Sequence, residues 1–178
     1  RLQRNLDGKN FYVVVSDGET AQPEYIELSR ENYINEMLAT GSLPVLMKNP
    51  IILNNKRKYD GGITDPLPVK KAYEMGARNI TLIRTYEESF IRKTKLENYI
   101  AALATKSYPK ISRALISNTE TYNSALEFIK NPPSDCTITQ ICPPHRLKTR
   151  RATTNQSTMK ADYLVGIKAG QKFLQKFL

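Results

Sequence analysis

Short runs of apolar, β-branched residues alternate along the whole chain with segments whose apolar residues have helical spacing. The first pattern predicts strands and the second predicts amphipathic helices. Strands are predicted over residues 11–15, 24–28, 51–53, 56–59, 79–84 and 136–142, and helices over residues 33–38, 70–75, 92–130 and 160–178. This order predicts an α/β fold in which a layered mixed sheet carries helices on both faces. The chain has 178 residues, enough for a single domain over residues 1–178 with its own core.

Local start and stop signals support these elements. Ser29 is a candidate N-cap for the first helix. The dipeptide Asn54-Asn55 tolerates positive φ and predicts a hairpin turn. Gly76 is expected to end the second helix.

The net positive charge lies entirely in the second half of the chain. Residues 1–90, the predicted sheet and Asp-Gly-Gly region, hold 12 basic and 12 acidic groups. Residues 91–178, a basic helical region with the last strand and helix, hold 15 basic and 5 acidic groups, a net charge of +10. Such a field attracts anionic lipid, nucleic acid or an acidic partner, although a solvated basic surface explains it equally well.

Other features bound the class of protein. No apolar run approaches the length of about 20 residues that a membrane-spanning helix needs. The N-terminus lacks both an apolar stretch and an initiator Met, so we expect a piece of a longer cytoplasmic protein, peripheral to a membrane at most. Cys136 and Cys142 are too few for a zinc site and are expected on one face of a strand, so no metal or cofactor is predicted.

The segment with the most chemical information runs from Tyr59 to Val69 and contains Asp60, Gly61 and Gly62. A carboxylate follows a strand, and two glycines then allow a sharp turn because they accept either sign of φ. We therefore expect the Asp60 carboxylate to face a cleft rather than the sheet, since sites of open α/β sheets lie at the carboxyl ends of strands.

This segment resembles the Asp-Gly-Gly motif of the patatin-like phospholipase family, and the second half of the chain is similar to its bacterial branch. The resemblance covers most of the chain and is sharpest over residues 38–84. Its further positions are Leu38 to Pro44, Lys58-Tyr59, Pro66 to Val69, Ala72, Gly76-Ala77, Ile80 to Arg84, Tyr163 and Gly166.

The resemblance implies part of a Ser–Asp dyad hydrolase fold that cleaves acyl esters of lipids. Asp60 would be the catalytic base, and the backbone at Gly61 and Gly62 would hold it in place. A serine hydroxyl needs such a base within hydrogen-bond reach.

The chain departs from that family at the nucleophile. No serine has glycine both two residues before and two residues after it: Ser16 lacks the first glycine and Ser42 lacks the second. A Ser–His–Asp site is not expected either, because the single histidine, His145, is predicted to lie in a surface loop. We therefore expect this chain alone to be inactive, and its partner to be a missing N-terminal part of the same protein.

Three further features are open to more than one interpretation. Lys56-Arg57-Lys58 is expected to protect an exposed sheet edge rather than bind phosphate. Arg146 to Arg151 is either a lipid-binding loop or a solvated one. Asp17 and Asp65 are expected to be turn or cap residues.

The last helix carries a stripe of lysines and an apolar side. It either lies on a membrane or covers a sheet. The alternative to a hydrolase is a non-catalytic basic module that binds an anionic membrane, with nucleic acid the less expected partner. The lysines are Lys168, Lys172 and Lys176, and the apolar residues are Tyr163, Leu164, Ile167, Leu174 and Leu178.

Overall fold

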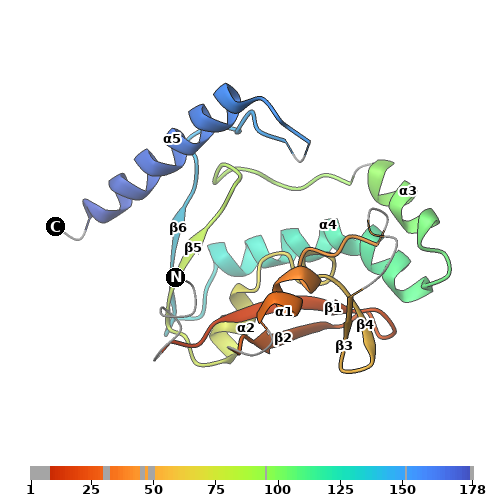
Figure 1. The fold of residues 1–178 in the computed structure, drawn as a ribbon. Helices are drawn as coiled ribbons and strands as arrows, with labels where there is room; N and C mark the ends of the chain where they lie inside the picture. The colour runs from red at the N-terminus through yellow and green to blue at the C-terminus, as the bar shows by residue number, and fades with distance from the viewer. Residues whose placement is uncertain are drawn as a thin grey trace. The chain divides into compact units, whose positions relative to one another are not determined.

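The computed structural model describes residues 9–29, 33–44, 47, 51–94, 96–150 and 152–176 (Figure 1). Contacts divide the chain into two compact units, residues 1–68 with 92–127 and residues 69–91 with 128–178. This division does not test the expectation of a single domain, which stays a prediction. The N-cap prediction for Ser29 depends on residues 30–32, which lie outside the described residues.

The first unit is built on a four-stranded antiparallel sheet with the strand order β2-β1-β4-β3. Its strands are β1 (Tyr12–Asp17), β2 (Pro23–Glu27), β3 (Ile51–Leu53) and β4 (Lys56–Asp60). The β3–β4 turn is made by Asn54 and Asn55, both at positive φ as the sequence predicts. Short turns of this kind join antiparallel neighbours, and the antiparallel pairing of β1 with β4 joins the two hairpins into one sheet.

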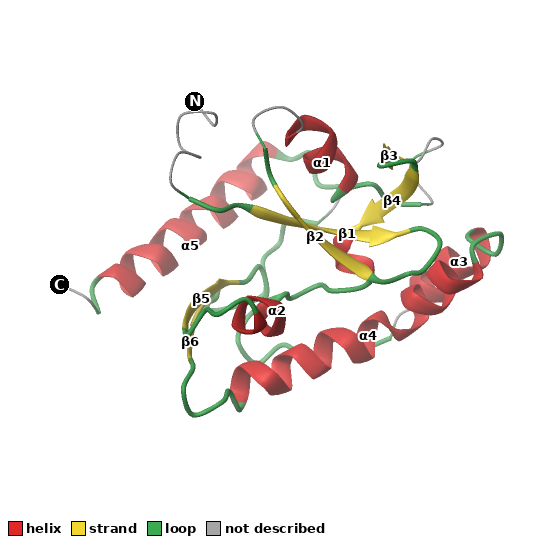
Figure 2. Cartoon of the chain, turned by 90° about the horizontal axis from the view of Figure 1, so that it is seen from below, coloured by secondary structure: helices red, strands yellow, loops and turns green. Residues whose placement is uncertain are grey.

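Helices cover both faces of this sheet. The helices of the unit are α1 (Tyr33–Ala39), α3 (Leu96–Ala104) and α4 (Pro109–Lys130), of which α4 continues beyond the unit. Figure 2 shows the sheet between α1 and α4. Tyr59 and Ile63 pack against Ile111 of α4 to form the buried core cluster of the unit. This packing fixes α4 beside the turn that follows β4.

The second unit holds a parallel pair of strands, β5 (Asn79–Ile83) and β6 (Thr137–Ile141). Its helices are α2 (Val69–Glu74) and α5 (Gln156–Leu174). Gly76, at φ +99°, follows α2 as predicted. The helix α5 begins earlier than the sequence suggested, because the Asn155 side chain caps it by accepting a hydrogen bond from the Thr158 N–H at 3.0 Å.

The predicted α/β class is confirmed, but the predicted single mixed sheet is wrong within the described residues. The strands form one antiparallel sheet of four and one parallel sheet of two. Short connections join β1 to β2 and β3 to β4 as antiparallel hairpins, whereas β5 and β6 are joined through α3 and α4, as parallel strands require. Among the described residues, no helix is both long and apolar enough to cross a bilayer.

The two cysteines flank β6. Cys136 is buried and Cys142 is half-buried, and both are free thiols. Burial raises the pKa of the Cys142 thiol, so at neutral pH it stays protonated and weakly nucleophilic.

Candidate functional site

Asp60, the predicted catalytic residue, is the last residue of β4 and is held by its backbone. Its N–H donates to the Ser42 carbonyl oxygen at 2.8 Å, and its carbonyl oxygen accepts from Ser16 Oγ at 2.8 Å. In the β1–β4 ladder Asp60 stands opposite Val15, whose side chain is fully buried. Hydrogen bonds to Ser42 and from Ser16 of β1 therefore hold the main chain at Asp60 on both sides.

The two glycines form a short 3₁₀ helix, Gly61–Ile63, of which Asp60 is the N-cap. Asp60 Oδ1 accepts a hydrogen bond from the Gly62 N–H at 2.8 Å. Neither glycine has positive φ, so the conformational argument made from the sequence is wrong. Gly61 is needed for close approach: a Cβ there would lie 2.1 Å from the carbonyl oxygen of Val14.

Asn118 of α4 clamps the turn that follows Asp60. Its Nδ2 donates to the carbonyl oxygens of Gly62 at 2.6 Å and Ile63 at 2.9 Å. The guanidinium of Arg92 donates to Asn118 Oδ1, which sets the orientation of the amide. Sequence reasoning missed Asn118, which lies on the apolar stripe of α4. The other members of that stripe are Ile111, Leu115 and Tyr122.

One oxygen of the Asp60 carboxylate is engaged and the other is open. Oδ1 binds the Gly62 N–H, and none of the described residues donates to Oδ2. Asp60 is half-buried, so its carboxylate is reachable. The arrangement is a carboxylate that is positioned by its own loop and whose Oδ2 accepts no hydrogen bond from the part of the chain that the structure describes.

The described serines close to Asp60 do not donate to its carboxylate. Ser16 is fully buried, and its Oγ lies 2.8 Å both from the Asp60 carbonyl oxygen and from Thr64 Oγ1. Ser42 is also fully buried, and its Oγ has no hydrogen-bond partner among the described residues. His145 is exposed and belongs to the second unit, in a loop as predicted.

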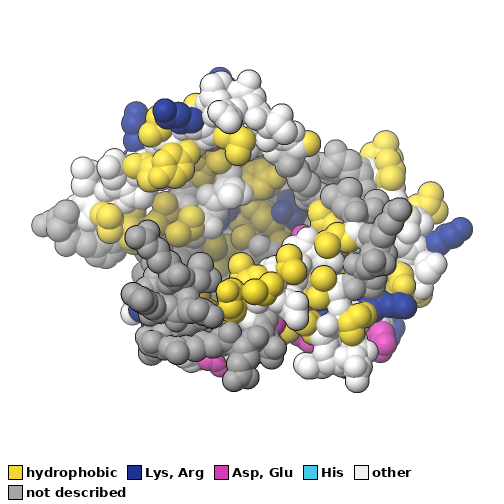
Figure 3. Space-filling model, in the orientation of Figure 1, with side chains coloured by type: hydrophobic (Ala, Val, Ile, Leu, Met, Phe, Trp, Pro, Cys, Tyr) yellow, Lys and Arg dark blue, Asp and Glu magenta, His cyan; other side chains and the backbone are white. Residues whose placement is uncertain are grey.

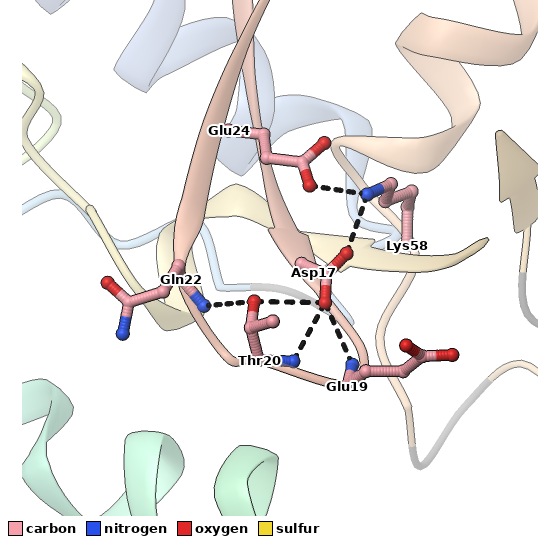
Figure 4. Close-up of polar contacts among 6 residues, drawn as sticks. All are labelled: Asp17, Glu19, Thr20, Gln22, Glu24 and Lys58. Atoms are coloured by element: carbon pink, nitrogen blue, oxygen red, sulfur yellow. Dashed lines mark hydrogen bonds and ion pairs between the residues drawn. The ribbon is translucent and has the colours of Figure 1, made fainter. Parts of the chain in front are cut away.

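A buried ion cluster lies on β4 two residues before Asp60 (Figure 4). The Lys58 ammonium is 2.8 Å from Asp17 Oδ2 and 2.7 Å from Glu24 Oε1. Lys58 and Asp17 are each 1% exposed. The predicted role of Lys58 in protecting a sheet edge is wrong, because β4 lies between β1 and β3 and the side chain is inside.

Burial and pairing act in opposite directions on the pKa values of this cluster, and pairing prevails. Burial by itself would raise the pKa of Asp17, but the hydrogen bonds from Lys58 and from the backbone and hydroxyl of Thr20 hold it well below its usual range. Burial would lower the pKa of Lys58, but Asp17 and Glu24 raise it. Both groups are therefore charged at neutral pH.

The other residues singled out from the sequence have structural partners. Asp17 is a turn residue as predicted, because its Oδ1 accepts from the N–H groups of Glu19 and Thr20. Asp65 accepts a hydrogen bond from the Tyr25 hydroxyl at 2.6 Å. Arg57 donates to the Tyr108 hydroxyl at 2.6 Å. These contacts account for the three side chains without a ligand.

Comparison with known proteins gives two findings. Residues 108–178 match a family described as "Domain of unknown function (DUF6363)". The chain is also 25% identical over 168 residues to "Uncharacterized protein YjjU" of Escherichia coli (strain K12). That alignment covers 94% of this chain and 47% of the relative, so the chain spans about half the relative's length.

These findings correct the family predicted from the sequence. Neither match is described as patatin-like, so the assignment to the patatin-like phospholipases and their bacterial branch is wrong. The physical reason is the small size of the motif. Asp60, Gly61 and Gly62 specify a capped 3₁₀ turn packed on a strand, and this local structure does not by itself define a family.

Proposed function

We propose that this chain supplies the carboxylate base of an acyl-ester hydrolase site, with Asp60 as that base. The observation that carries the proposal is the hydrogen bonding of the two oxygens of the Asp60 carboxylate. Oδ1 is fixed by the Gly62 N–H, whereas Oδ2 receives no hydrogen bond from the described residues. A general base must be positioned and must have an acceptor atom within reach of the proton it removes.

The surrounding contacts favour a base over an ordinary helix cap. The Asp60 backbone is held at both its N–H and its carbonyl oxygen, and Asn118 holds the next turn through two carbonyl oxygens. Restraint of this kind reduces the reorganisation needed when a proton is transferred.

The nucleophile in this proposal is a serine hydroxyl other than those of Ser16 and Ser42, which do not donate to the Asp60 carboxylate. Asp60 takes the proton from the hydroxyl as its oxygen attacks the acyl carbon, and the proton then passes to the leaving alcohol. Water subsequently hydrolyses the acyl-serine. The relative is about twice as long as this chain, which leaves room for a nucleophile and oxyanion donors in a longer protein. The chain by itself is expected to be inactive.

The substrate class proposed is a lipid acyl ester. The net charge of +10 favours an anionic lipid over a neutral one, because a positive field raises the local concentration of anionic substrates. No step of the proposal uses a metal or a cofactor.

The test is performed on the full native reading frame that contains this chain. Hydrolysis of a chromogenic acyl ester and covalent labelling by a fluorophosphonate are measured for the parent protein and for Asp60→Asn. Asparagine keeps the cap acceptor but removes the charge, so fold and turn are retained. Activity and labelling should fall by roughly 10²–10⁴-fold.

The matched control is Asp135→Asn, which removes an exposed carboxylate paired with Arg78. It should leave both readouts unchanged. Equal activity in the parent and in Asp60→Asn, or no activity in the parent, would rule out Asp60 as a catalytic base.

A further inference from the structure

The helix α5 packs loosely on its own unit, because none of its 19 residues is fully buried. Its inward side consists of half-buried residues that recur every three or four positions, among them Val165, Ala169 and Phe173. This side borders a cleft that also includes Pro143 and Pro144. The sequence left open whether the last helix covers a sheet, and in the structure α5 contacts β6 of the parallel pair while none of its residues is fully buried.

A second side of α5, next to the half-buried one, is apolar and exposed. Met159, Tyr163, Ile167 and Leu174 fall within an arc of about 80° at about 100° per residue. Tyr163 is 66% exposed and Leu174 is 59% exposed. Figure 3 shows hydrophobic and basic side chains side by side over this helix. We call these four residues and the neighbouring, half-exposed Leu164 the α5 apolar stripe.

The charge around this stripe is almost entirely positive. Residues 142–178 contain eight Lys or Arg and one acidic residue, Asp162. Asp162 is engaged within the unit, because its Oδ2 accepts a hydrogen bond from the Thr149 N–H at 2.6 Å, which lowers the pKa of its carboxyl group. At about 100° per residue, Lys160 lies between Ile167 and Leu164 and Lys168 lies beyond Leu164, and both lysines are exposed. An exposed apolar stripe bordered by lysines fits an interface that is apolar inside and negatively charged outside.

We propose that α5 and the basic loop before it bind the surface of a bilayer containing anionic phospholipid, with the α5 apolar stripe in contact with the acyl chains. In this arrangement Lys160, Lys168 and the loop residues Arg146 and Arg150 lie at the level of the phosphates. Nucleic acid is a poorer fit because aliphatic side chains such as Ile167 and Leu174 gain nothing from phosphates or stacked bases. This inference is independent of Asp60 and of the hydrolase proposal.

Sedimentation with vesicles tests the proposal on the chain itself. The probes are vesicles of phosphatidylcholine alone and vesicles with about one-third phosphatidylglycerol, near the anionic content that attracts basic segments. Binding to the anionic vesicles should be at least tenfold stronger and should weaken as salt is added. Tyr163→Gln with Ile167→Gln should reduce it by about tenfold or more.

The matched control lies on α3, which also has exposed apolar residues but belongs to the other unit. Tyr99→Gln with Leu103→Gln changes the same spacing of i and i+4, and these residues are 51% and 72% exposed. This variant should bind anionic vesicles as the parent does. Equal loss in the two variants would overturn the proposal.

A second readout separates insertion of the helix from simple attraction of charge. The chain has no Trp, so Tyr163→Trp and Tyr99→Trp each introduce a single tryptophan reporter. Anionic vesicles should shift the emission of the first reporter to the blue and leave the second unchanged. Binding without a blue shift at position 163 would overturn the proposal. Absence of vesicle binding would also overturn it, including the case in which the chain instead self-associates or binds a protein partner through α5.

Discussion

Replacing Lys58 by Met tests whether the buried ion cluster holds the sheet of the first unit together. Methionine keeps most of the volume of the lysine stem but removes the ammonium, which contacts Asp17 Oδ2 at 2.8 Å and Glu24 Oε1 at 2.7 Å. Asp17 is 1% exposed, so its carboxylate would be left charged and without its cationic partner inside the protein. We expect a large loss of stability.

The magnitude follows from what each carboxylate keeps. Removing one partner of a buried ion pair costs about 3–5 kcal/mol. Asp17 Oδ1 would still accept three hydrogen bonds, from the N–H of Glu19 and from the N–H and hydroxyl of Thr20. The Glu24 side chain is 40% exposed and can be rehydrated. The loss should therefore lie near the lower end, about 3 kcal/mol.

The pH dependence has a definite sign for each group. The folded-state pKa of Asp17 is depressed, so its contribution to stability is complete above its unfolded pKa of about 4 and is lost as the pH falls through the folded pKa. The pKa of Lys58 is raised, so its contribution is complete below about pH 10 and is lost as the pH rises through the folded pKa. The stability difference between the parent and Lys58→Met should be greatest between these limits.

Amide hydrogen exchange of β1 and β4 is the suitable assay, because it reports the opening of this unit separately from the other. A loss of about 3 kcal/mol corresponds to roughly 10²-fold faster exchange at pH 7. Lys56→Met is the control, since Lys56 lies on the same strand with an exposed side chain and should change stability by less than about 0.5 kcal/mol. Exchange in Lys58→Met within threefold of the control would refute the reasoning.

Two other predictions concern the turn that follows Asp60. Asn118→Ala should leave the sheet intact but increase the exchange rate of the Gly62 amide by about tenfold, and an unchanged rate in an NMR exchange series would show that Asn118 does not hold the turn. Gly61→Ala should destabilise the first unit by at least about 1–3 kcal/mol in urea unfolding, because its Cβ would lie 2.1 Å from the Val14 carbonyl oxygen. Gly166→Ala in α5, where nothing lies within 4 Å, should instead stabilise its unit by about 0.5–1 kcal/mol, and losses of equal size in the two variants would contradict the argument.

Many elements of the fold could be predicted because each is specified by neighbouring residues, although the helix predicted over residues 92–130 is divided into α3 and α4. Asn54 and Asn55 make the β3–β4 turn because Asn tolerates positive φ, and Gly76 follows α2 at positive φ for a related steric reason. The hairpins β1–β2 and β3–β4 could be predicted because short connections permit antiparallel pairing, but the β1–β4 pairing that joins them into one sheet links residues far apart in the sequence. The separation of β5 and β6 into a second sheet depends on distant contacts and could not be predicted from local patterns.

The same limit applies to charged side chains. Lys58 lies within a run of three basic residues, which is typical of an exposed strand edge. Its burial depends on Asp17, which stands opposite it in the β1–β4 register, and on Glu24 of the next strand. The register brings together residues 41 positions apart in the sequence. The charge pattern alone therefore predicts an exposed Lys58 side chain, whereas the side chain is buried.

The candidate site shows how far a short motif can support an inference about function. Asp60 with two glycines specifies a capped turn, and the structure contains that turn. The proposal that Asp60 is a base rests on the hydrogen bonding of its carboxylate. The turn that follows it is held by Asn118, a polar residue on a stripe otherwise formed by Ile111, Leu115 and Tyr122. A polar residue on an apolar helix stripe must find a buried partner, so the sequence signals that Asn118 has one but not that it is the turn at Gly62. In the proposed function the group that approaches Asp60 Oδ2 is a serine hydroxyl, and fluorophosphonate labelling of the full-length protein tests for that serine directly.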